Sequence, residues 1–426
     1  MKLKIQKAYI NLDATGCDEI SSTIRLHGSK SISNRALIIQ ALCHGKFEIN
    51  NLSDSDDTRI LRALLYSEEE MLDAHHAGTT FRFLTAYFAL TGRNTILTGS
   101  ERMKQRPIGP LVEALRSLGA SIDYIENDGY PPVKINSPIS QPPSIVRLNA
   151  GISSQYVSAL LMVAPTLPDG LEIILEGDVV SKPYIEMTLQ MMEYFGIKTD
   201  RKENSIRVQH QHYQARDFFV ESDWSAASYF YSIAGLSKSA TITLEGLNEK
   251  SLQGDSVIVR LGEKFGIKTE YLDHKIVIRK VSGVKDTAFF EYDFIQQPDI
   301  AQSISVLAAG QGTHTVYTGL QTLKIKETDR IAALQQELAK FGVYLSPVPE
   351  RLSGKSGKSY YLQEGKAMPP DNDVCIDTYN DHRMAMAFAP LALKFPVCIA
   401  DPEVVSKSYP GFWDDLKKLG FIIKFS

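Results

Sequence analysis

A chain of 426 residues exceeds the size at which one hydrophobic core keeps growing, so two domains are the first expectation. Its net charge of −4 and its 43% of apolar residues give no reason to expect nucleic acid or a membrane as partner, and no stretch approaches the roughly 18 apolar residues of a membrane span. Its cysteines, Cys17, Cys43, Cys375 and Cys398, are scattered without a CxxC pair, which argues against a zinc site and predicts reduced thiols.

The chain begins with an alternating segment, KLKIQKAYI (residues 2–10). This pattern predicts a single strand that must join a sheet formed later in the chain, so one domain would be discontinuous. The segment also lacks the apolar core of a signal peptide. We therefore expect a cytoplasmic protein.

The next stretch, HGSKSISNRALIIQALCHG (27–45), runs from a polar cluster into an apolar helical pattern. It places Lys30 and Arg35 near the start of a helix, the end whose dipole repels cations. Either these cations are solvated, or an anionic group lies between them.

Five segments share one pattern: an amphipathic helix, a glycine and then a β-branched or alternating run, which predicts a helix, a glycine cap and a strand. The expected capping glycines are Gly119, Gly196, Gly266, Gly342 and Gly420, spaced about 70 to 80 residues apart. A sixth helix, SDDTRILRALLYS (55–67), lacks the glycine and the strand. Six units over two domains suggest three units per domain, with chance similarity of amphipathic helices as the alternative.

Polar clusters precede apolar helices three times more in the first half of the chain: HAGTTFRF (76–83), RMKQRPIGPLVEAL (102–115) and GISSQYVSALLMVAP (151–165). Backbone amides at such helix starts form anion sites, and Gly78 would let a ligand approach the backbone. A plain helix cap explains each cluster on its own.

The second half repeats the arrangement. QPDIAQSISVLAAG (297–310) carries Asp299, LKIKETDRIAALQQEL (323–338) is dense in charge, and YNDHRMAMAFAPLAL (379–393) begins with Asp381, His382 and Arg383. An aspartate cap and a solvated charge run are the alternatives for the first two. Between them and the last, residues 345–372 are rich in Gly, Ser, Pro and Lys and predict a long hairpin or loop.

The recurrence of these clusters at helix starts in both halves indicates that helix N-termini of two similar domains could converge on one anionic ligand or set of ligands. Carboxylates and a histidine nearby would supply acid and base groups. The sequence has no GxxxxGK[ST], no GxGxxG after a strand and no HExxH. Kinase, dehydrogenase and metalloprotease functions therefore lack their usual support.

Six ordered motifs, GSKSISNRAL, AGTTFRFLTA, RPIGPLVEAL, SSQYVSALLM, KETDRIAAL and NDHRMAMAF, resemble the 5-enolpyruvylshikimate-3-phosphate synthase family from about residue 27 to residue 412. The resemblance implies an α/β fold of two similar domains, each of three βαβαββ units in an inside-out α/β barrel, with the active site in the cleft between domains. We expect one domain at 28–221, its first unit truncated, and a discontinuous one at 1–27 plus 222–426.

The resemblance also implies transfer of the enolpyruvyl group of phosphoenolpyruvate to the 5-hydroxyl of shikimate 3-phosphate by a monomer, with no metal or organic cofactor. The implied catalytic residues are Asp299, Glu327, Lys30 and Lys407. The implied shikimate 3-phosphate ligands are Lys30, Ser31, Arg35, Ser153, Ser154, Gln155, Ser181, Tyr184, Asp299 and Lys326. The implied phosphoenolpyruvate ligands are Lys30, Gly78, Arg106, Gln155, Arg330, Arg383 and Lys407.

The chain departs from the family pattern at His76, usually Asn, at Phe83, usually Pro, and at Thr322, where an Asn usually contacts the shikimate phosphate. One alternative function is enolpyruvyl transfer to UDP-N-acetylglucosamine, which uses a loop cysteine, but residues 99–110 contain none. Another is an inactive anion-binding repeat protein, which would need the cations but not Asp299 and Glu327.

Overall fold

The computed structural model describes residues 8–140, 144–149, 151, 153–281, 288–353, 358–372 and 374–426. The chain folds into two compact units, Gly28–Glu221 and Met1–His27 with Ser222–Ser426, here called the inserted unit and the discontinuous unit. The discontinuous unit is closed across the insertion by strands β2 (Glu19–Arg25) and β13 (Ser239–Glu245), which pair in parallel over seven residues each.

In its described residues the inserted unit contains two four-stranded sheets and one two-stranded sheet, in the orders β4-β5-β7-β6, β10-β11-β9-β8 and β12-β3. Its elements are α1 (Lys30–Leu42), β3 (Ile49–Asn50), α2 (Asp56–Tyr66), β4 (Met71–Asp73), α3 (Gly78–Thr91), β5 (Thr95–Thr98), η1 (Met103–Gln105), α4 (Gly109–Ser117), β6 (Ser121–Tyr124), β7 (Val133–Ser137), β8 (Ile145–Asn149), α5 (Ser154–Val163), η2 (Ala164–Thr166), β9 (Leu171–Glu176), α6 (Lys182–Tyr194), β10 (Thr199–Lys202), β11 (Ser205–Val208) and β12 (Phe218–Phe219).

The described part of the discontinuous unit contains three four-stranded sheets, in the orders β14-β15-β13-β2, β16-β17-β19-β18 and β20-β21-β1-β22. Its elements, besides β2 and β13, are β1 (Tyr9–Asp13), α7 (Trp224–Leu236), η3 (Gly254–Val257), α8 (Ile258–Lys264), β14 (Ile267–Leu272), β15 (Lys275–Lys280), β16 (Phe289–Asp293), η4 (Pro298–Ile300), α9 (Ala301–Gln311), β17 (His314–Thr318), η5 (Gln321–Ile325), α10 (Arg330–Ala339), β18 (Tyr344–Pro347), α11 (Glu350–Ser353), β19 (Tyr361–Glu364), β20 (Cys375–Ile376), α12 (His382–Phe388), η6 (Ala389–Leu393), β21 (Val397–Ala400), η7 (Pro402–Lys407), α13 (Phe412–Lys418) and β22 (Ile422–Phe425).

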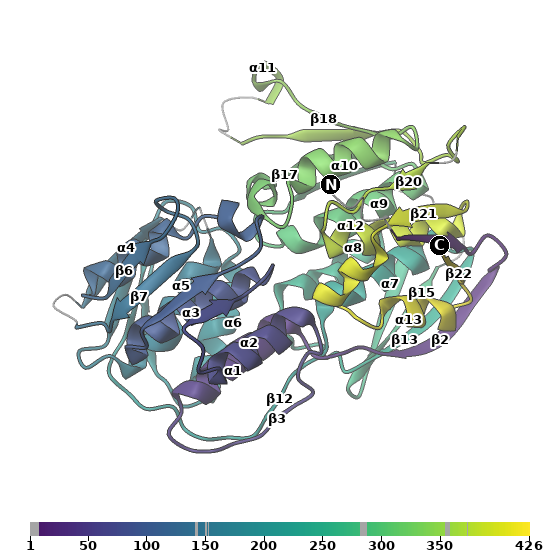
Figure 1. Cartoon of the computed structure of the whole chain (residues 1–426). Coiled ribbons are helices and arrows are strands. Elements are labelled where there is room, and N and C mark those ends of the chain that lie inside the picture. The colour runs from purple at the N-terminus through teal and green to yellow at the C-terminus, as the bar shows by residue number, and fades with distance from the viewer. Residues whose placement is uncertain are drawn as a thin grey trace. The chain divides into compact units, whose positions relative to one another are not determined.

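The four-stranded sheets share one pairing pattern, in which a parallel pair is followed by two antiparallel pairs. In the first, β4 pairs in parallel with β5, β5 is antiparallel to β7, and β7 is antiparallel to β6. Read in chain order with α3 and α4, this is the βαβαββ unit that the resemblance implied. In the last sheet the N-terminal strand β1 lies between β21 and β22 (Figure 1), so β1 is the final strand of the βαβαββ unit that the C-terminal part of the chain otherwise forms.

The repeated helix, glycine and strand pattern is confirmed at all five predicted positions. Each capping glycine has a positive φ, from 71° to 93°, and each lies between a helix (α4, α6, α8, α10 or α13) and the strand that follows it. The sixth helix, α2, ends instead at Ser67 in an extended conformation, with φ −69° and ψ 142°. Its neighbouring sheet, β12-β3, has two strands among the described residues.

Apolar helices form the interior of each unit, because a helix that is apolar all round has no face to give to solvent. In the inserted unit α3 and α5 pack together, and both contact α1. In the discontinuous unit α7, α9 and α12 pack on one another, and all residues of α12 are buried. Each of these helices except α7 begins at one of the polar clusters found in the sequence, or directly after it.

The hairpin predicted within residues 345–372 is present among the described residues as β18, antiparallel to β19, with α11 in the connection. The loop residues 354–357 lie outside the described part of the chain. In Figure 1, β18 and α11 lie at one edge of the discontinuous unit. Residues 2–7 of the predicted N-terminal strand are likewise outside the described residues, and β1 begins at Tyr9.

The expectation that all four cysteines are reduced is wrong for one pair. Cys375 of β20 and Cys398 of β21 form a disulfide, while Cys17 and Cys43 are free. The two bonded residues are register partners on neighbouring parallel strands. Sequence spacing does not show this contact, because it depends on which strands become neighbours.

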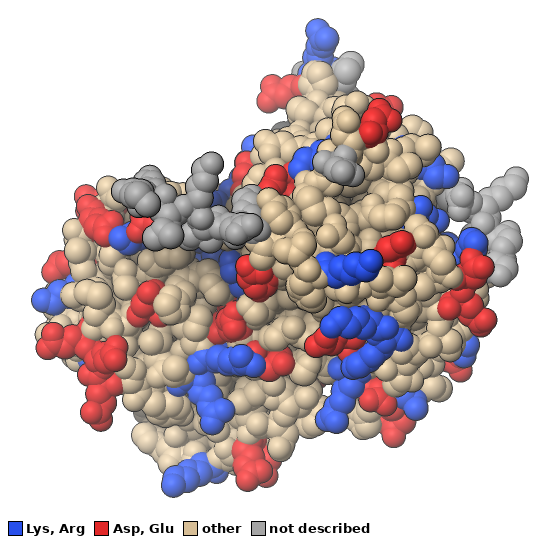
Figure 2. Space-filling view, turned by 45° about the vertical axis from the view of Figure 1, so that its right-hand side comes forward, with Lys and Arg blue, Asp and Glu red and all other residues tan. Residues whose placement is uncertain are grey.

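The surface agrees with the charge composition. On the face drawn in Figure 2, Lys and Arg side chains are interspersed with Asp and Glu side chains. Among the described residues, no helix combines the length and the apolar character needed to cross a bilayer.

Candidate active site

The start of α1 answers the question raised by its cations. Lys30 is the first residue of α1, and its Nζ lies 3.6 Å from Oδ2 of Asp57 in α2. His76 Nε2 lies 3.5 Å from Oδ1 of the same carboxylate, and the Thr80 hydroxyl donates to the Asp57 carbonyl at 2.9 Å. Asp57 therefore joins the first turns of α1, α2 and α3. Sequence reasoning missed this residue because it reads as part of a solvated first turn.

Gly78 is the first residue of α3, and the Arg106 guanidinium lies directly against it. A Cβ placed at Gly78 would be 2.6 Å from both Nη1 and Nη2 of Arg106, closer than any side chain tolerates. Arg106 is 5% exposed and also donates from Nη1 to the His76 carbonyl at a long 3.5 Å. Arg82 donates to the carbonyls of Gly78 and Pro107, so it ties the two sides of this contact together.

The start of α5 lies beside the start of α3. Ser153 is the N-cap of α5 and accepts from the Gln155 N–H at 3.3 Å. The Gln155 side chain donates from Nε2 to Thr79 Oγ1 at 3.0 Å. Ser154 is buried in the first turn. The structure thus brings together Lys30, Gly78, Arg106 and Gln155, which the sequence placed in four separate clusters.

Arg35 lies deeper than the sequence suggested, with 2% of its surface exposed. Its guanidinium donates to Thr188 Oγ1 (2.7 Å), the Ser31 carbonyl (2.9 Å), Ser158 Oγ (3.1 Å) and the Tyr184 carbonyl (3.2 Å). Burial lowers its pKa to about 10. These bonds hold the first turns of α6, whose N-cap Ser181 has a left-handed φ of 53°, against α1 and α5.

In the discontinuous unit, Asp299 is the centre of an ion cluster. It lies in η4, just before α9, and its Oδ1 accepts from Lys326 Nζ (3.3 Å) and Arg330 Nη1 (3.2 Å) while Oδ2 pairs with Arg383 Nη2 (3.0 Å). Burial alone would raise the pKa of this carboxyl, but the three cations hold it well below its ordinary value. Burial lowers the pKa of Lys326, although Asp299 opposes that shift.

Arg330, the first residue of α10, connects three carboxylates. It donates from Nε to Asp381 Oδ2 and from Nη2 to Glu327 Oε2, both at 2.7 Å, in addition to its bond with Asp299. Burial would lower its pKa, but these carboxylates raise the pKa above its ordinary value. With 1% of its surface exposed, Arg330 does not fit the solvated charge run that was the alternative for this segment.

The start of α12 supplies the remaining cations. Asp381 caps the helix by accepting from the Arg383 N–H, and Arg383 donates from Nη1 to the Asp299 carbonyl at 2.8 Å. Lys407, at the end of η7, donates from Nζ to the Asn380 carbonyl at 2.6 Å. Six predicted residues, Asp299, Lys326, Glu327, Arg330, Arg383 and Lys407, are therefore gathered around the starts of α9, α10 and α12.

Two further residues of this unit bear on the cluster. Asp255 in η3 is 3% exposed and accepts from Ser225 Oγ, and burial and then the Asp299 charge raise its pKa to about 7. No sequence pattern marked Asp255, because a lone carboxylate before a helix reads as a cap. Thr322, the departure noted above, is 8% exposed in η5.

The predicted site residues divide by unit: Asp299, Lys326, Glu327, Arg330, Arg383 and Lys407 belong to the discontinuous unit and the others to the inserted unit. Both groups lie at helix starts, where backbone amides and the helix dipole favour anions. The chemistry available is anion binding by cations and two carboxylates suited to proton transfer.

The comparisons with known proteins show which family the chain belongs to. The family model of EPSP synthase (3-phosphoshikimate 1-carboxyvinyltransferase) matches residues 14–67 and 61–416. The chain belongs to the EPSP synthase family. It is therefore a transferase of the shikimate pathway, and its closely matching relatives carry the same description.

One relative, the 3-phosphoshikimate 1-carboxyvinyltransferase of Bacteroides fragilis, is 47% identical over 408 residues, which cover 95% of this chain and 97% of the relative. That of Vibrio campbellii is 38% identical over 432 residues, covering 94% and 97%. The solved EPSP synthase of Acinetobacter baumannii matches with a TM-score of 0.76 over 99% of this chain and 100% of that chain. At 19% identity, this last match is a likeness of fold.

Proposed function

We propose that this chain transfers the enolpyruvyl group of phosphoenolpyruvate to the 5-hydroxyl of shikimate 3-phosphate, with the residues of the six motifs as its site. Shikimate 3-phosphate would bind Ser31, Arg35, Ser153, Ser154, Gln155, Ser181, Tyr184 and Lys326, together with Lys30 and Asp299. Phosphoenolpyruvate would bind Gly78, Arg106, Gln155, Arg330, Arg383 and Lys407, with Lys30. Both substrates are polyanions, so a site rich in cations and helix starts suits them.

The reaction is an addition of the 5-hydroxyl to phosphoenolpyruvate, followed by an elimination of phosphate. The 5-hydroxyl oxygen forms a bond to C2 of phosphoenolpyruvate, Asp299 accepts the hydroxyl proton, and Glu327, assisted by Lys30 or Lys407, gives a proton to the methylene carbon C3. In the second step Glu327 removes a proton from the new methyl group, the C2–C3 double bond reforms, and the C2–O bond to phosphate breaks. General acid–base assistance contributes typically about 10² to 10⁴ in rate.

Substrate binding would prepare Asp299 for this role. With its pKa held well below the ordinary range by Arg383, Lys326 and Arg330, Asp299 is a weak base in the arrangement described above. An effective base has a pKa near the operating pH. Substrate anions that draw these cations toward themselves would raise the pKa of Asp299, so base strength would appear when both substrates are present.

One observation carries the proposal: Asp299 and Glu327, the two carboxylates that the reaction needs, are both bound by Arg330. A protein that only bound anions would gain nothing from placing two carboxylates on the cation that should hold its ligand.

The test is phosphate release from phosphoenolpyruvate, with shikimate 3-phosphate or UDP-N-acetylglucosamine as acceptor, for the wild type, Asp299→Asn and the control Asp273→Asn. Asp273 lies in the same unit, and its side chain is 97% exposed. We expect release with shikimate 3-phosphate alone, a loss of about 10² to 10⁴ in kcat for Asp299→Asn, and an unchanged control. Release with UDP-N-acetylglucosamine would identify the alternative acceptor, and no release with either would favour an inactive anion-binding protein.

We propose further that the protein acts as a cytoplasmic monomer, as the family resemblance implies. Light scattering of the purified protein tests the monomer. The disulfide between Cys375 and Cys398 bears on the location, because disulfides are rare in reducing compartments. Alkylation of thiols in intact cells before lysis would show whether this pair is oxidised where the protein works.

A further inference from the structure

Glu337, a buried carboxylate of α10, takes no part in the proposed chemistry. Its side chain is 0% exposed, yet both of its oxygens are occupied. Oε2 accepts from Lys340 Nζ at 2.6 Å and from the Asp377 N–H at 3.0 Å, and Oε1 accepts from the Tyr379 hydroxyl at 2.6 Å. A buried carboxylate is tolerated only with such a full set of donors. The set connects α10 to the segment that leads into α12.

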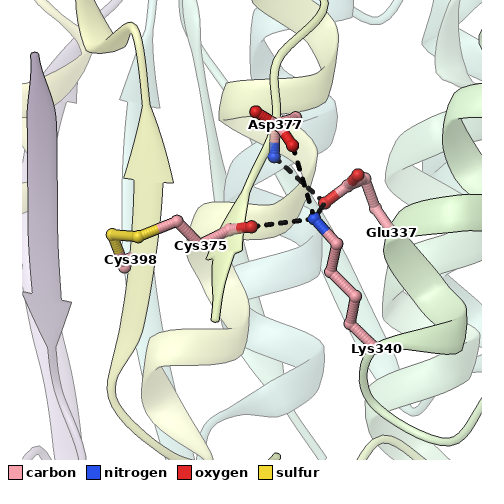
Figure 3. Close-up of a disulfide and its surroundings, with 5 residues drawn as sticks. All are labelled: Glu337, Lys340, Cys375, Asp377 and Cys398. Atoms are coloured by element: carbon pink, nitrogen blue, oxygen red, sulfur yellow. Dashed lines mark hydrogen bonds and ion pairs between the residues drawn. A yellow bond between two sulfur atoms is a disulfide. The ribbon is translucent and has the colours of Figure 1, made fainter. Parts of the chain in front are cut away.

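The same segment is held at its beginning by Lys340 and by the disulfide (Figure 3). Lys340 donates to the Cys375 carbonyl at 2.8 Å and lies 3.6 Å from Asp377 Oδ2. Cys375 is bonded to Cys398, in the strand that precedes η7 and Lys407. The short strand β20 is thus fixed to α10 on one side and to β21 on the other.

The turn after β20 has an uncommon backbone. Tyr379 and Asn380 are consecutive residues with left-handed φ values of 53° and 57°. Residues other than glycine hold this conformation only where their surroundings impose it, and such strain is typical of functional sites. Burial and then the Glu337 charge raise the pKa of Tyr379, so its phenol stays protonated and able to donate.

This turn determines where three cations of the site lie. The Asn380 carbonyl accepts from Lys407, and Asp381 binds Arg330 while capping the helix that carries Arg383. A turn that relaxed to ordinary φ values would move the Asn380 carbonyl and the Asp381 carboxylate away from these partners. All three cations are in the set proposed to bind phosphoenolpyruvate.

We propose that Glu337 is a positioning residue for phosphoenolpyruvate: through the Tyr379 hydroxyl and the Asp377 amide it holds the 379–380 turn in the backbone conformation that places Lys407, Arg330 and Arg383. Glu337 touches neither substrate and acts through these residues. This inference rests on the function proposed above.

The decisive variant is Tyr379→Phe, which removes one hydroxyl and keeps the ring. We expect KM for phosphoenolpyruvate to rise about tenfold, since a hydrogen bond to a charged group is lost, while KM for shikimate 3-phosphate changes little. The thermal midpoint should fall as well, because the buried Glu337 carboxylate loses one of its donors. Tyr344→Phe is the matched control, because Tyr344 is 61% exposed in the same unit. Glu337→Ala should raise KM for phosphoenolpyruvate further, and Glu337→Gln, which keeps an oxygen acceptor, should partly restore it.

A second measurement separates this inference from the proposed function. Amide hydrogen exchange over residues 378–383, measured without substrates, should be faster in Tyr379→Phe and Glu337→Gln than in the wild type and the control. Unchanged exchange, or a fall in thermal midpoint with KM for phosphoenolpyruvate at its wild-type value, would overturn the positioning role. If the wild type released no phosphate, the proposed function would fail, whereas the exchange result would still decide whether Glu337 holds the turn.

Discussion

The two units hold their most deeply buried site arginines in opposite ways. In the inserted unit, Arg35 is bound by hydroxyls and backbone carbonyls, four neutral oxygens in all. In the discontinuous unit, Arg330 is bound by the carboxylates of Asp299, Glu327 and Asp381. Both arginines are almost fully buried, so the difference lies in the partners and not in the depth.

Arg35 therefore keeps an uncompensated positive charge, whereas carboxylates neutralise the charge of Arg330. Neutral oxygens satisfy the N–H groups of Arg35 but leave its charge uncompensated, and its pKa falls to about 10 on burial. Carboxylates raise the pKa of Arg330 above its ordinary value. We therefore expect the inserted unit to attract an anionic substrate directly, and the discontinuous unit to bind one only in competition with its own carboxylates.

The largest effect is expected when the losses in free energy of unfolding are compared for Arg330→Met and Arg35→Met. Arg330→Met takes one cation away from three carboxylates, of which Asp299 keeps Lys326 and Arg383; breaking a buried ionic network in this way typically costs about 3–5 kcal/mol. Arg35→Met leaves neutral groups without donors, at about 1–3 kcal/mol. Urea unfolding followed by circular dichroism at pH 7 measures both free energies. Equal losses would mean that the two arginines are held by equivalent interactions.

The pH dependence sharpens this test. The folded-state pKa of Asp299 is depressed, so its contribution to stability is present above its unfolded pKa of about 3.9 and is lost as the pH falls through the folded value. The deficit of Arg330→Met should therefore shrink as the pH falls from about 4 through the folded-state pKa of Asp299, where this carboxyl becomes protonated. The deficit of Arg35→Met should stay constant, because its partners do not titrate.

The second test uses the disulfide, which ties strands of the discontinuous unit alone. Its two cysteines are 23 residues apart, and closing a loop of that size stabilises a fold by about 3 kcal/mol in the chain-entropy model. Reduction with dithiothreitol should lower the stability of this unit. Both tryptophans, Trp224 and Trp413, are buried in it, so tryptophan fluorescence reports its unfolding separately.

The control for this second test is the double variant Cys375→Ser with Cys398→Ser, which should resemble the reduced wild type and should not respond to dithiothreitol. Amide exchange in residues 28–221 should be the same with and without reductant. An equal loss of protection in both units would show that the disulfide stabilises more than the sheet it joins.

Local features of the fold could be predicted from the sequence because their causes are local. The five glycine caps follow from the left-handed φ that ends a helix, and Gly119 or Gly342 supplies it without help from distant residues. The missing cap at Ser67 likewise marked the shortened unit around α2. The disulfide could not be predicted in this way, since it depends on the register of β20 and β21.

The site was predictable as a set of motifs but not as a set of contacts. The charge run at 323–338 gave no sign of which charges would be buried, and the structure buries Arg330 while Lys324 stays exposed. Asp57 and Glu337 read as ordinary surface positions of amphipathic helices, although both are buried and bound by cations. Such residues are recognisable only when the partners that compensate their charge are known.

The smallest expected effect comes from Gly78→Ala, which tests whether a cation of the inserted unit can be displaced cheaply. The new Cβ would lie 2.6 Å from the Arg106 guanidinium, which is the far end of a flexible side chain and also donates to the His76 carbonyl at 3.5 Å. We expect Arg106 to move, KM for phosphoenolpyruvate to rise about 10- to 100-fold for one weakened charged contact, and stability to change by less than about 1 kcal/mol. Gly16→Ala is the control, because nothing lies within 4 Å of a Cβ there. An unchanged KM would mean that Arg106 does not contact phosphoenolpyruvate. A large loss of stability would mean that Arg106 is held as rigidly as Arg330, so the two units would not differ in how they hold their cations.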